Sequence, residues 1–335
     1  MLKQELSREI IQEYPNVFAI DGNLDRLVKK IELLTYLNPL NIEKEKHRFF
    51  SSKYVDEPIF KYKKLQFDPY KLNRLFFSQR LERIKDEQIR KFYQEVVYYY
   101  ANMIQCIETI GQNKKFYYNS LRVYGTPTEK DVQNARLILH LADEPDTEDM
   151  EKIYTPEDAK VYFEEFVQQY NFPLNISFSN SIAADAMVSN NTQSLLIKKN
   201  TIFSRNQLLT LANHEIGVHL VTTYNGMMQP LKVFSNGFPK NVETFDMLHG
   251  QYKLDRNKAF TITMRVHRGG GFTKDRLYLS GLKKIYKRHK NGLSMDALLT
   301  GKVTMESEAT INRFKDLGLA NDLTHNNVAF KRNCN

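Results

Sequence analysis

Apolar residues in the first third of the chain recur at the spacing of α-helices. They stand three and four positions apart in residues 23–37 and again in residues 80–111, so each stretch would present one apolar face to a core. The second stretch could form one long helix, which we expect to end near Gly111 because glycine commonly follows the last turn of a helix. Residues 1–120 are therefore predicted to be largely helical.

Strand-like alternation replaces the helical spacing in the second half of the chain. Residues 174–180 alternate between apolar and polar side chains, and residues 186–200 indicate two strands joined by an Asn-rich turn. Ser204 and Gln207 then form the S-x-x-Q capping box that begins a helix, and the Asn-Gly pair at 225–226 is expected to end it. We therefore expect an α+β fold that is predominantly helical, with a small antiparallel sheet next to this capped helix.

An acidic, proline-containing segment at residues 143–159 is the best candidate for a domain boundary. Within it, Thr155 can cap a following helix whose first position is Pro156. The sequence thus predicts a helical N-terminal region over residues 1–145 and a second domain over residues 151–335 that contains the capped helix.

The composition is that of a soluble globular protein. Of 335 residues, 41% are hydrophobic and 26% are charged, and there is no apolar run long enough to span a membrane. The N-terminal stretch is charged and amphipathic, unlike a secretory signal. Two cysteines are too few for a disulfide framework or a cysteine-built zinc site. We expect a cytoplasmic protein with no membrane partner.

The net charge of +9 raises the question of a nucleic-acid partner. Basic residues cluster at 283–290, but acidic and basic residues are otherwise interspersed, and no zinc finger, RNP-type motif or basic tail is present. A solvated basic surface accounts for this charge, and an anionic substrate or partner is its more specific functional interpretation. No specific nucleic-acid binding is predicted.

The capped helix contains the stretch NHEIGVHL, in which His214 and His219 flank Glu215. In the common zinc motif H-E-x-x-H, the two histidines lie four apart on one helix face. The spacing of five found here corresponds to about 140° of rotation and roughly 7.5 Å of rise on an ideal helix. A local π-bulge would reduce that angular gap, and Gly217 between the histidines makes such a distortion less costly.

Two interpretations of this motif remain open on spacing alone. In the first, His214 and His219 supply neutral nitrogen ligands to a metal ion, for which zinc is the best candidate. Glu215 would then accept a proton from a water molecule on the metal, and a third protein ligand would come from a later helix. In the second, a core helix carries two unrelated histidines, one of them buried and hydrogen-bonded.

A second informative stretch, residues 260–282, begins as an amphipathic helix and reaches three consecutive glycines at 269–271. Positive charge is concentrated around this turn, where side chains and backbone N–H groups could hold a carboxylate or a phosphate. A helix that simply ends in glycine and carries solvated basic residues is the other interpretation. The basic residues concerned are Arg265, His267, Arg268 and Lys274.

Together, HEIGVH and RVHRGGGFTKDRLYLSG resemble the flavohaemoglobin-expression-modulating QEGLA-motif proteins of bacteria, relatives of the eukaryotic microtubule-associated tyrosine carboxypeptidases. The resemblance covers roughly residues 60–330 and is densest over residues 204–320. It implies a zincin-like zinc metallopeptidase in which the HExxxH spacing is the family's own. It also implies that the C-terminus of a peptide or protein substrate is recognised near the basic glycine-rich turn.

One departure from the family concerns the third metal ligand. That ligand is the glutamate of a Gln-Glu-Gly-Leu-Ala motif downstream of HExxxH, and this sequence has no such motif. Asp246, in the stretch VETFDML, stands at the ligand position by direct count, and Glu243 is the other carboxylate within reach. An internal deletion that joined VET to a later helix would explain the loss of the motif. The third ligand is then either replaced or lost.

Two functions follow from these considerations. The first is a zinc-dependent metallopeptidase of the tyrosine-carboxypeptidase type that removes C-terminal residues from a peptide or protein. The second is a catalytically impaired relative that lacks the third ligand and acts as a binding or regulatory protein. In the first, the implied roles are metal ligand for His214, His219 and Asp246, base for Glu215, oxyanion assistance for Tyr278, and recognition of the terminal carboxylate for Arg265, Arg268 and Lys274.

Overall fold

The computed structural model describes residues 8–29, 31–133, 151–180, 182, 184–189, 193–238, 256–274 and 276–327. The chain forms two compact units, each assembled from separate segments. The first unit comprises Met1–Glu13, Ala142–Asn241 and Tyr286–Asn335, and the second comprises Tyr14–Leu141 and Val242–Ile285. The predicted boundary between residues 145 and 151 falls largely outside the described residues and stays a prediction.

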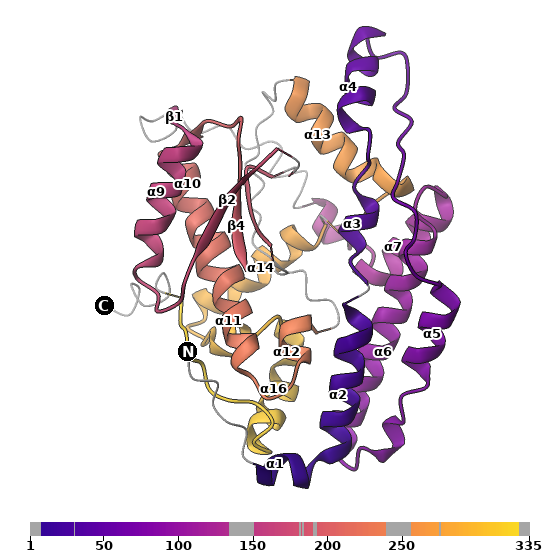
Figure 1. The fold of residues 1–335 in the computed structure, drawn as a ribbon, viewed down its shortest axis with the longest axis vertical. Helices are drawn as coiled ribbons and strands as arrows, with labels where there is room; N and C mark the ends of the chain where they lie inside the picture. The colour runs from indigo at the N-terminus through magenta and orange to yellow at the C-terminus, as the bar shows by residue number, and fades with distance from the viewer. Residues whose placement is uncertain are drawn as a thin grey trace. The chain divides into compact units, whose positions relative to one another are not determined.

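The second unit contains helices and no strand among its described residues, which confirms the prediction that this part of the chain is largely helical (Figure 1). Residues 23–37 fall in two helices, because the chain leaves the helical path after Lys29 and Glu32 adopts an extended conformation. Apolar spacing does not reveal this break, since helical spacing is kept on both sides of it. The helices are α2 (Pro15–Val28), α3 (Leu33–Leu37), α4 (Ile42–Ser51), α5 (Pro69–Phe77), α6 (Glu87–Glu108), α7 (Lys114–Tyr124) and α13 (Arg256–His267), with 3-10 turns at Leu81–Arg83 and Arg268–Gly270.

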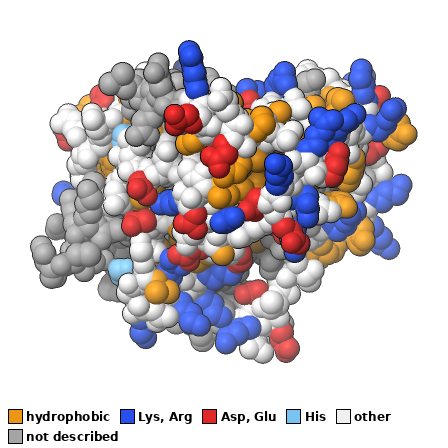
Figure 2. Space-filling model, turned by 90° about the horizontal axis from the view of Figure 1, so that it is seen from below, with side chains coloured by type: hydrophobic (Ala, Val, Ile, Leu, Met, Phe, Trp, Pro, Cys, Tyr) orange, Lys and Arg blue, Asp and Glu red, His pale blue; other side chains and the backbone are white. Residues whose placement is uncertain are grey.

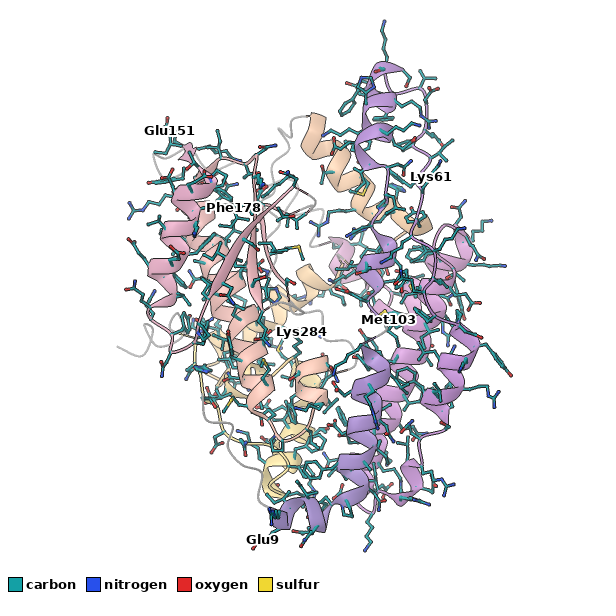
Figure 3. The ribbon with its side chains drawn as sticks, in the orientation of Figure 1. Glu9, Lys61, Met103, Glu151, Phe178 and Lys284 are labelled. Atoms are coloured by element: carbon teal, nitrogen blue, oxygen red, sulfur yellow. The ribbon has the colours of Figure 1, made fainter. Side chains whose placement is uncertain are left out.

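Helix α6 supplies the longest apolar face of this unit. The carboxylate of Asp86 caps its start by accepting a hydrogen bond from the N–H of Ile89. Buried residues then recur every three or four positions as far as Ile107, and Met103, labelled in Figure 3, is one of them. The helix ends at Glu108, close to the predicted stop at Gly111.

The first unit contains a three-stranded sheet in the order β2-β4-β3, built from β2 (Asn175–Ser179), β3 (Ala186–Ser189) and β4 (Ser194–Lys198). Strands β3 and β4 pair antiparallel as the hairpin predicted by the Asn-rich turn, but β2 pairs parallel with β4. The sheet is therefore mixed: the predicted antiparallel pairing is confirmed for β3 with β4 but does not hold for β2. The reason is topological: β3 folds back onto β4, so β2 joins the opposite edge of β4 in the same direction. A separate antiparallel pair joins β1 (Lys152–Tyr154) to β5 (Phe203–Ser204).

A single helical rod follows this sheet and carries the HExxxH motif (Figure 1). It consists of α10 (Arg205–Leu211), a π-helix (Ala212–Leu220) and α11 (Val221–Met228). The capping box at its start is present as predicted, with the Ser204 hydroxyl accepting from the N–H of Gln207 and the Gln207 side chain accepting from the N–H of Ser204.

The rod ends at Met228, two positions beyond the predicted stop at the Asn-Gly pair, so both residues of that pair lie inside α11 and do not end it. Asn225 is fully buried and donates from its amide to the carbonyls of Leu299 and His325. Gly226 allows the backbone at Phe234 to approach, since a Cβ there would lie 2.7 Å from the Phe234 carbonyl oxygen. Both residues serve tertiary contacts, which the local sequence does not reveal.

The core of the first unit lies between the sheet, the rod and α9 (Pro156–Val167). Thr155 and Asp158 form a capping box at the start of α9 with Pro156 in its first turn, which confirms the predicted helix start. Phe178, labelled on β2 in Figure 3, packs against this core. The remaining helices are α1 (Arg8–Glu13), α12 (Val233–Asn236), α15 (Asp296–Leu299) and α16 (Glu308–Asp316), with a 3-10 turn at Met305–Ser307, while α14 (Arg276–Lys290) begins in the second unit and ends in the first.

The surface carries both signs of charge. On the face drawn in Figure 2, Lys and Arg side chains lie among Asp, Glu and apolar side chains. None of the described helices combines the length and the apolar character needed to cross a membrane.

Candidate metal centre

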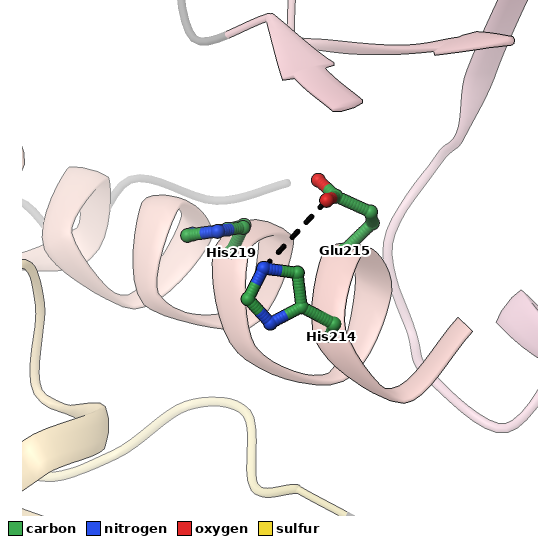
Figure 4. A group of neighbouring side chains, drawn as sticks. All are labelled: His214, Glu215 and His219. Atoms are coloured by element: carbon green, nitrogen blue, oxygen red, sulfur yellow. Dashed lines mark ion pairs between the residues drawn. The ribbon is translucent and has the colours of Figure 1, made fainter. Parts of the chain in front are cut away.

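The π-helical stretch Ala212–Leu220 brings the two histidines of the HExxxH motif together. On an ideal α-helix they would diverge by about 140°, but here the ring centroids of His214 and His219 are 4.6 Å apart with an interplanar angle of 78°. The local widening that the spacing required is therefore present. Figure 4 shows both rings and the carboxylate of Glu215 gathered on one side of the helix.

Glu215 is held between His214 and the sheet. Its Oε1 lies 3.7 Å from Nε2 of His214, and its Oε2 accepts a hydrogen bond of 2.7 Å from the backbone N–H of Val188. Val188 belongs to β3, which lies at one edge of the three-stranded sheet, so the donor is a backbone N–H of an edge strand. Glu215 and His214 are each only 6% exposed, so the carboxylate is fixed in a water-poor position.

Gly217 lies at the point where the π-helix contacts the side chains of Asn327 and Tyr170. A Cβ at this position would lie 3.1 Å from Nδ2 of Asn327 and 3.2 Å from the hydroxyl oxygen of Tyr170. Those distances are tighter than ordinary van der Waals contact, so the absence of a side chain lets both polar groups reach the helix backbone.

The donor set of this cluster fits a zinc ion. One ligand atom each from His214, Glu215 and His219 can be chosen so that all three lie within 4.8 Å of one another. Zinc binds imidazole nitrogen at ~2.0–2.1 Å, which places two such ligand atoms about 3.4 Å apart in a tetrahedral site. Imidazole is a ligand that zinc takes in catalytic sites, and the carboxylate of Glu215 lies beside the two rings.

The predicted replacements for the third ligand lie outside the described residues. Asp246 and Glu243 both fall in the interval 239–255, for which the structure describes no placement. Their roles stay predictions.

The predicted substrate-binding residues belong to the second unit, so their relation to the histidine cluster also stays a prediction. Arg265 and Lys274 are half-buried. Arg268 is only 7% exposed, donates from Nη1 to Oδ1 of Asn38 at 2.6 Å, and lies over the ring of Phe272 with its guanidinium carbon 5.0 Å from the centroid. Tyr278 lies in α14, and its side chain is outside the described part of the structure.

The glycine-rich turn packs closely against the loop between α6 and α7. The N–H of Gly269 donates to the hydroxyl of Tyr62 at 2.7 Å, and its carbonyl accepts from the N–H of Gly111 at 2.8 Å. Gly270 has a φ of +110°, and a Cβ on it would lie 2.4 Å from the Cα of Asn113. These contacts favour the interpretation of the glycines as a tightly packed helix end, since the N–H of Gly269 already has an acceptor.

Two contacts of the centre were not found from the sequence. The N–H of Val188 reaches Glu215 across 27 positions, and the side-chain amide of Asn327 donates to the carbonyl of Gly217 across 110 positions at 2.8 Å. Neither residue stands in a motif, and a strand N–H or a single asparagine carries no local signal of such a role.

One family model matches most of the chain. The model of the microtubule-associated tyrosine carboxypeptidase family matches residues 47–244 and 241–335. A search of curated proteins finds no match. Because the family model covers most of the sequence, including both the HExxxH motif and the glycine-rich turn, the chain belongs to the microtubule-associated tyrosine carboxypeptidase family.

Proposed function

We propose that this protein is a zinc-dependent metallopeptidase that removes C-terminal residues from a peptide or protein. The observation that carries the proposal is the convergence of His214 and His219 on the π-helix, directly beside the carboxylate of Glu215. Family membership supports the same reaction, because the family is named for a tyrosine carboxypeptidase. We also propose that the first unit has a zincin-like arrangement, for which the sheet beside the HExxxH helix is the support.

His214 and His219 would hold the ion through their ring nitrogens. A zinc ion bound there would act as a Lewis acid and would make a water molecule easier to deprotonate. Glu215 would act as general base, taking a proton from the attacking water and passing it to the departing amine. The hydrogen bond from Val188 fixes one carboxylate oxygen, which leaves Oε1 on the side of His214 to receive the proton.

Arg265 and Lys274 would bind the terminal carboxylate of the substrate. Tyr278 would help to stabilise the oxyanion. Arg268 is the weakest member of this set, because its guanidinium is buried, donates to Asn38 and stacks on Phe272. A positively charged side chain suits this role, since a carboxypeptidase must recognise a free carboxylate and charge-assisted hydrogen bonds to carboxylates are the strong ones.

A second candidate function is a family member that binds but does not cleave. Its support is the missing Gln-Glu-Gly-Leu-Ala motif, together with the way the family match falls into two segments that meet at residues 241–244. That junction coincides with the stretch VETFDML, where we propose that an internal segment has been lost. The third ligand would then come from Asp246 or Glu243, or be absent.

Metal analysis followed by a peptide assay distinguishes the two functions. The peptidase predicts stoichiometric zinc that is lost in His214→Ala, and release of the C-terminal amino acid from peptides ending in tyrosine. Absence of bound zinc at micromolar concentration refutes the peptidase. Stoichiometric zinc without any release from a panel of peptides favours the non-cleaving relative.

A further inference from the structure

The C-terminal segment Asn321–Asn327 runs along the HExxxH rod from its end back toward its centre. The N–H of Asn321 donates to Oε1 of Gln229 at 2.7 Å, and its side-chain amide donates to the carbonyl of Met228 at 3.1 Å. Further along, the N–H of His325 donates to Oδ1 of Asn225 at 2.8 Å, and the carbonyl of His325 accepts from the same side chain at 2.7 Å. These hydrogen bonds fix the position of the segment along the rod before it reaches the π-helix.

Two side-chain donors lie within hydrogen-bond distance of three successive carbonyls of the π-helix. Asn327, at the end of this segment, donates to the carbonyl of Gly217 at 2.8 Å. The hydroxyl of Thr222 lies within hydrogen-bond distance of the next two, 2.8 Å from the carbonyl oxygen of Val218 and 3.2 Å from that of His219. These carbonyls lie in the turn between Glu215 and the second histidine, the part of the helix that must be wide for the two rings to meet.

A π-turn is rare because its backbone geometry is less favourable than that of an α-helix, so it persists where other contacts favour it. Side-chain donors to the carbonyls of the π-turn favour the wide form. Each such carbonyl oxygen can accept a side-chain hydrogen bond in addition to its backbone hydrogen bond, because it has two lone pairs. Asn327 is 2% exposed, so its amide would lose a donor–acceptor contact in a dry environment if the helix contracted.

We propose that Asn327, assisted by Thr222, is a positioning residue that holds the π-turn open and thereby sets the separation of His214 and His219. The inference rests on the proposed function, in which these histidines share a metal ion. When the helix relaxes to the α form, the histidines diverge by about 140° and cannot share an ion. The apparent metal affinity then falls in proportion to the fraction of molecules that keep the wide turn.

Substitution of Asn327 tests this inference directly. Asn327→Ala removes the donor, and Asn327→Asp keeps the size but places a carboxylate against the Gly217 carbonyl. Asn321→Ala is the matched control, because it removes an asparagine amide that donates to a carbonyl of the same rod outside the π-turn. Thr222→Val removes the hydroxyl of the second donor, and Thr222→Ser restores it.

The measurements are the Co²⁺ and Zn²⁺ dissociation constants by chelator competition, the visible absorption spectrum of bound Co²⁺, and the melting temperature of the metal-free protein. We expect Asn327→Ala, Asn327→Asp and Thr222→Val to weaken binding by about 10-fold or more and to alter the Co²⁺ spectrum, as loss of outer contacts does at other metal sites. Asn321→Ala and Thr222→Ser should bind within about twofold of the unmodified protein, even where they lower the melting temperature.

Equal affinities and spectra for Asn327→Ala and Asn321→Ala would overturn the inference while leaving the proposed function intact. Failure of the unmodified protein to bind Co²⁺ or Zn²⁺ would refute the proposed function and the inference with it. The two failures are thus distinguished by the unmodified protein alone.

Discussion

Gly226 offers a direct test of the packing that supports the HExxxH rod. Replacement by alanine places a Cβ 2.7 Å from the carbonyl oxygen of Phe234 and 3.2 Å from the Cα of Ser235. Both neighbours are backbone atoms, so relief requires α11 or the segment after it to shift by about half an ångström. Overpacking of this kind costs ~1–3 kcal/mol.

Helix propensity acts in the opposite direction, because alanine is favoured over glycine inside a helix by about 1 kcal/mol. Because the atoms that clash belong to the backbone and cannot rotate away, the overpacking cost should fall in the upper part of that range, about 2–3 kcal/mol, and the net expectation for Gly226→Ala is a loss of about 1–2 kcal/mol. Gly22→Ala isolates the propensity term, since Gly22 lies inside α2 and a Cβ there meets nothing within 4 Å. That control should stabilise the protein by about 0.5–1 kcal/mol.

Thermal unfolding followed by circular dichroism and tyrosine fluorescence measures both effects, since the protein contains no tryptophan. For a domain of 150–250 residues, 1 kcal/mol corresponds to about 2–4 °C in melting temperature. Gly226→Ala should therefore melt several degrees below the unmodified protein, and Gly22→Ala should not. If Gly226→Ala melts at the same temperature or higher, the close approach of α11 to Phe234 is refuted.

Three further predictions concern single side chains. Glu215→Gln should keep the metal but lower peptide cleavage by about 10²–10⁴-fold, because an amide cannot accept the proton; undiminished cleavage would exclude this residue as the base. Arg288 pairs with Glu308 through two hydrogen bonds of 2.8 Å and holds the pKa of that carboxyl below its usual 4.5. The pair therefore stabilises the fold above that pH and loses its effect as the pH falls through the lowered pKa, so Arg288→Ala should reduce the melting temperature at pH 7 by more than in strongly acidic buffer, where only the hydrogen bond from Arg288 to the carbonyl of Ser294 is lost. Since the Glu308 side chain is 41% exposed, solvent screening limits the pH-dependent part of the loss to about 0.5–1 kcal/mol, and a loss that stays the same at every pH would contradict the assignment. Tyr93→Phe removes the hydroxyl that donates to buried Asp21 at 2.9 Å and should cost about 1–3 kcal/mol in urea unfolding, whereas no change would indicate that this hydrogen bond contributes nothing.

Local signals in the sequence predicted those parts of the fold that local interactions determine. The predicted cap at Thr155 and the predicted capping box at Ser204 place two helix starts correctly, because a cap and the groups it bonds lie within the first turn. The hairpin of β3 and β4 follows in the same way from its turn. In contrast, the parallel pairing of β2 and the continuation of α11 through Gly226 depend on distant contacts, which a local pattern does not encode.

In the candidate site too, the local motif was predictable from the sequence and the contacts from distant segments were not. His214, Glu215 and His219 stand in one short motif, and the requirement for a widened helix follows from the geometry of their spacing. The contacts from Val188 and Asn327 come from segments far away in the chain, so only the folded structure identifies them.

The central claim is that histidines five positions apart share one metal ion on a π-helix. Titration of the metal-free protein with Co²⁺, followed by its visible spectrum, tests this most directly. The account predicts one equivalent of tetrahedral Co²⁺ in the unmodified protein, displaced by Zn²⁺, and loss of that spectrum in both His214→Ala and His219→Ala. A protein that binds no Co²⁺, or one whose spectrum survives the loss of either histidine, would contradict it.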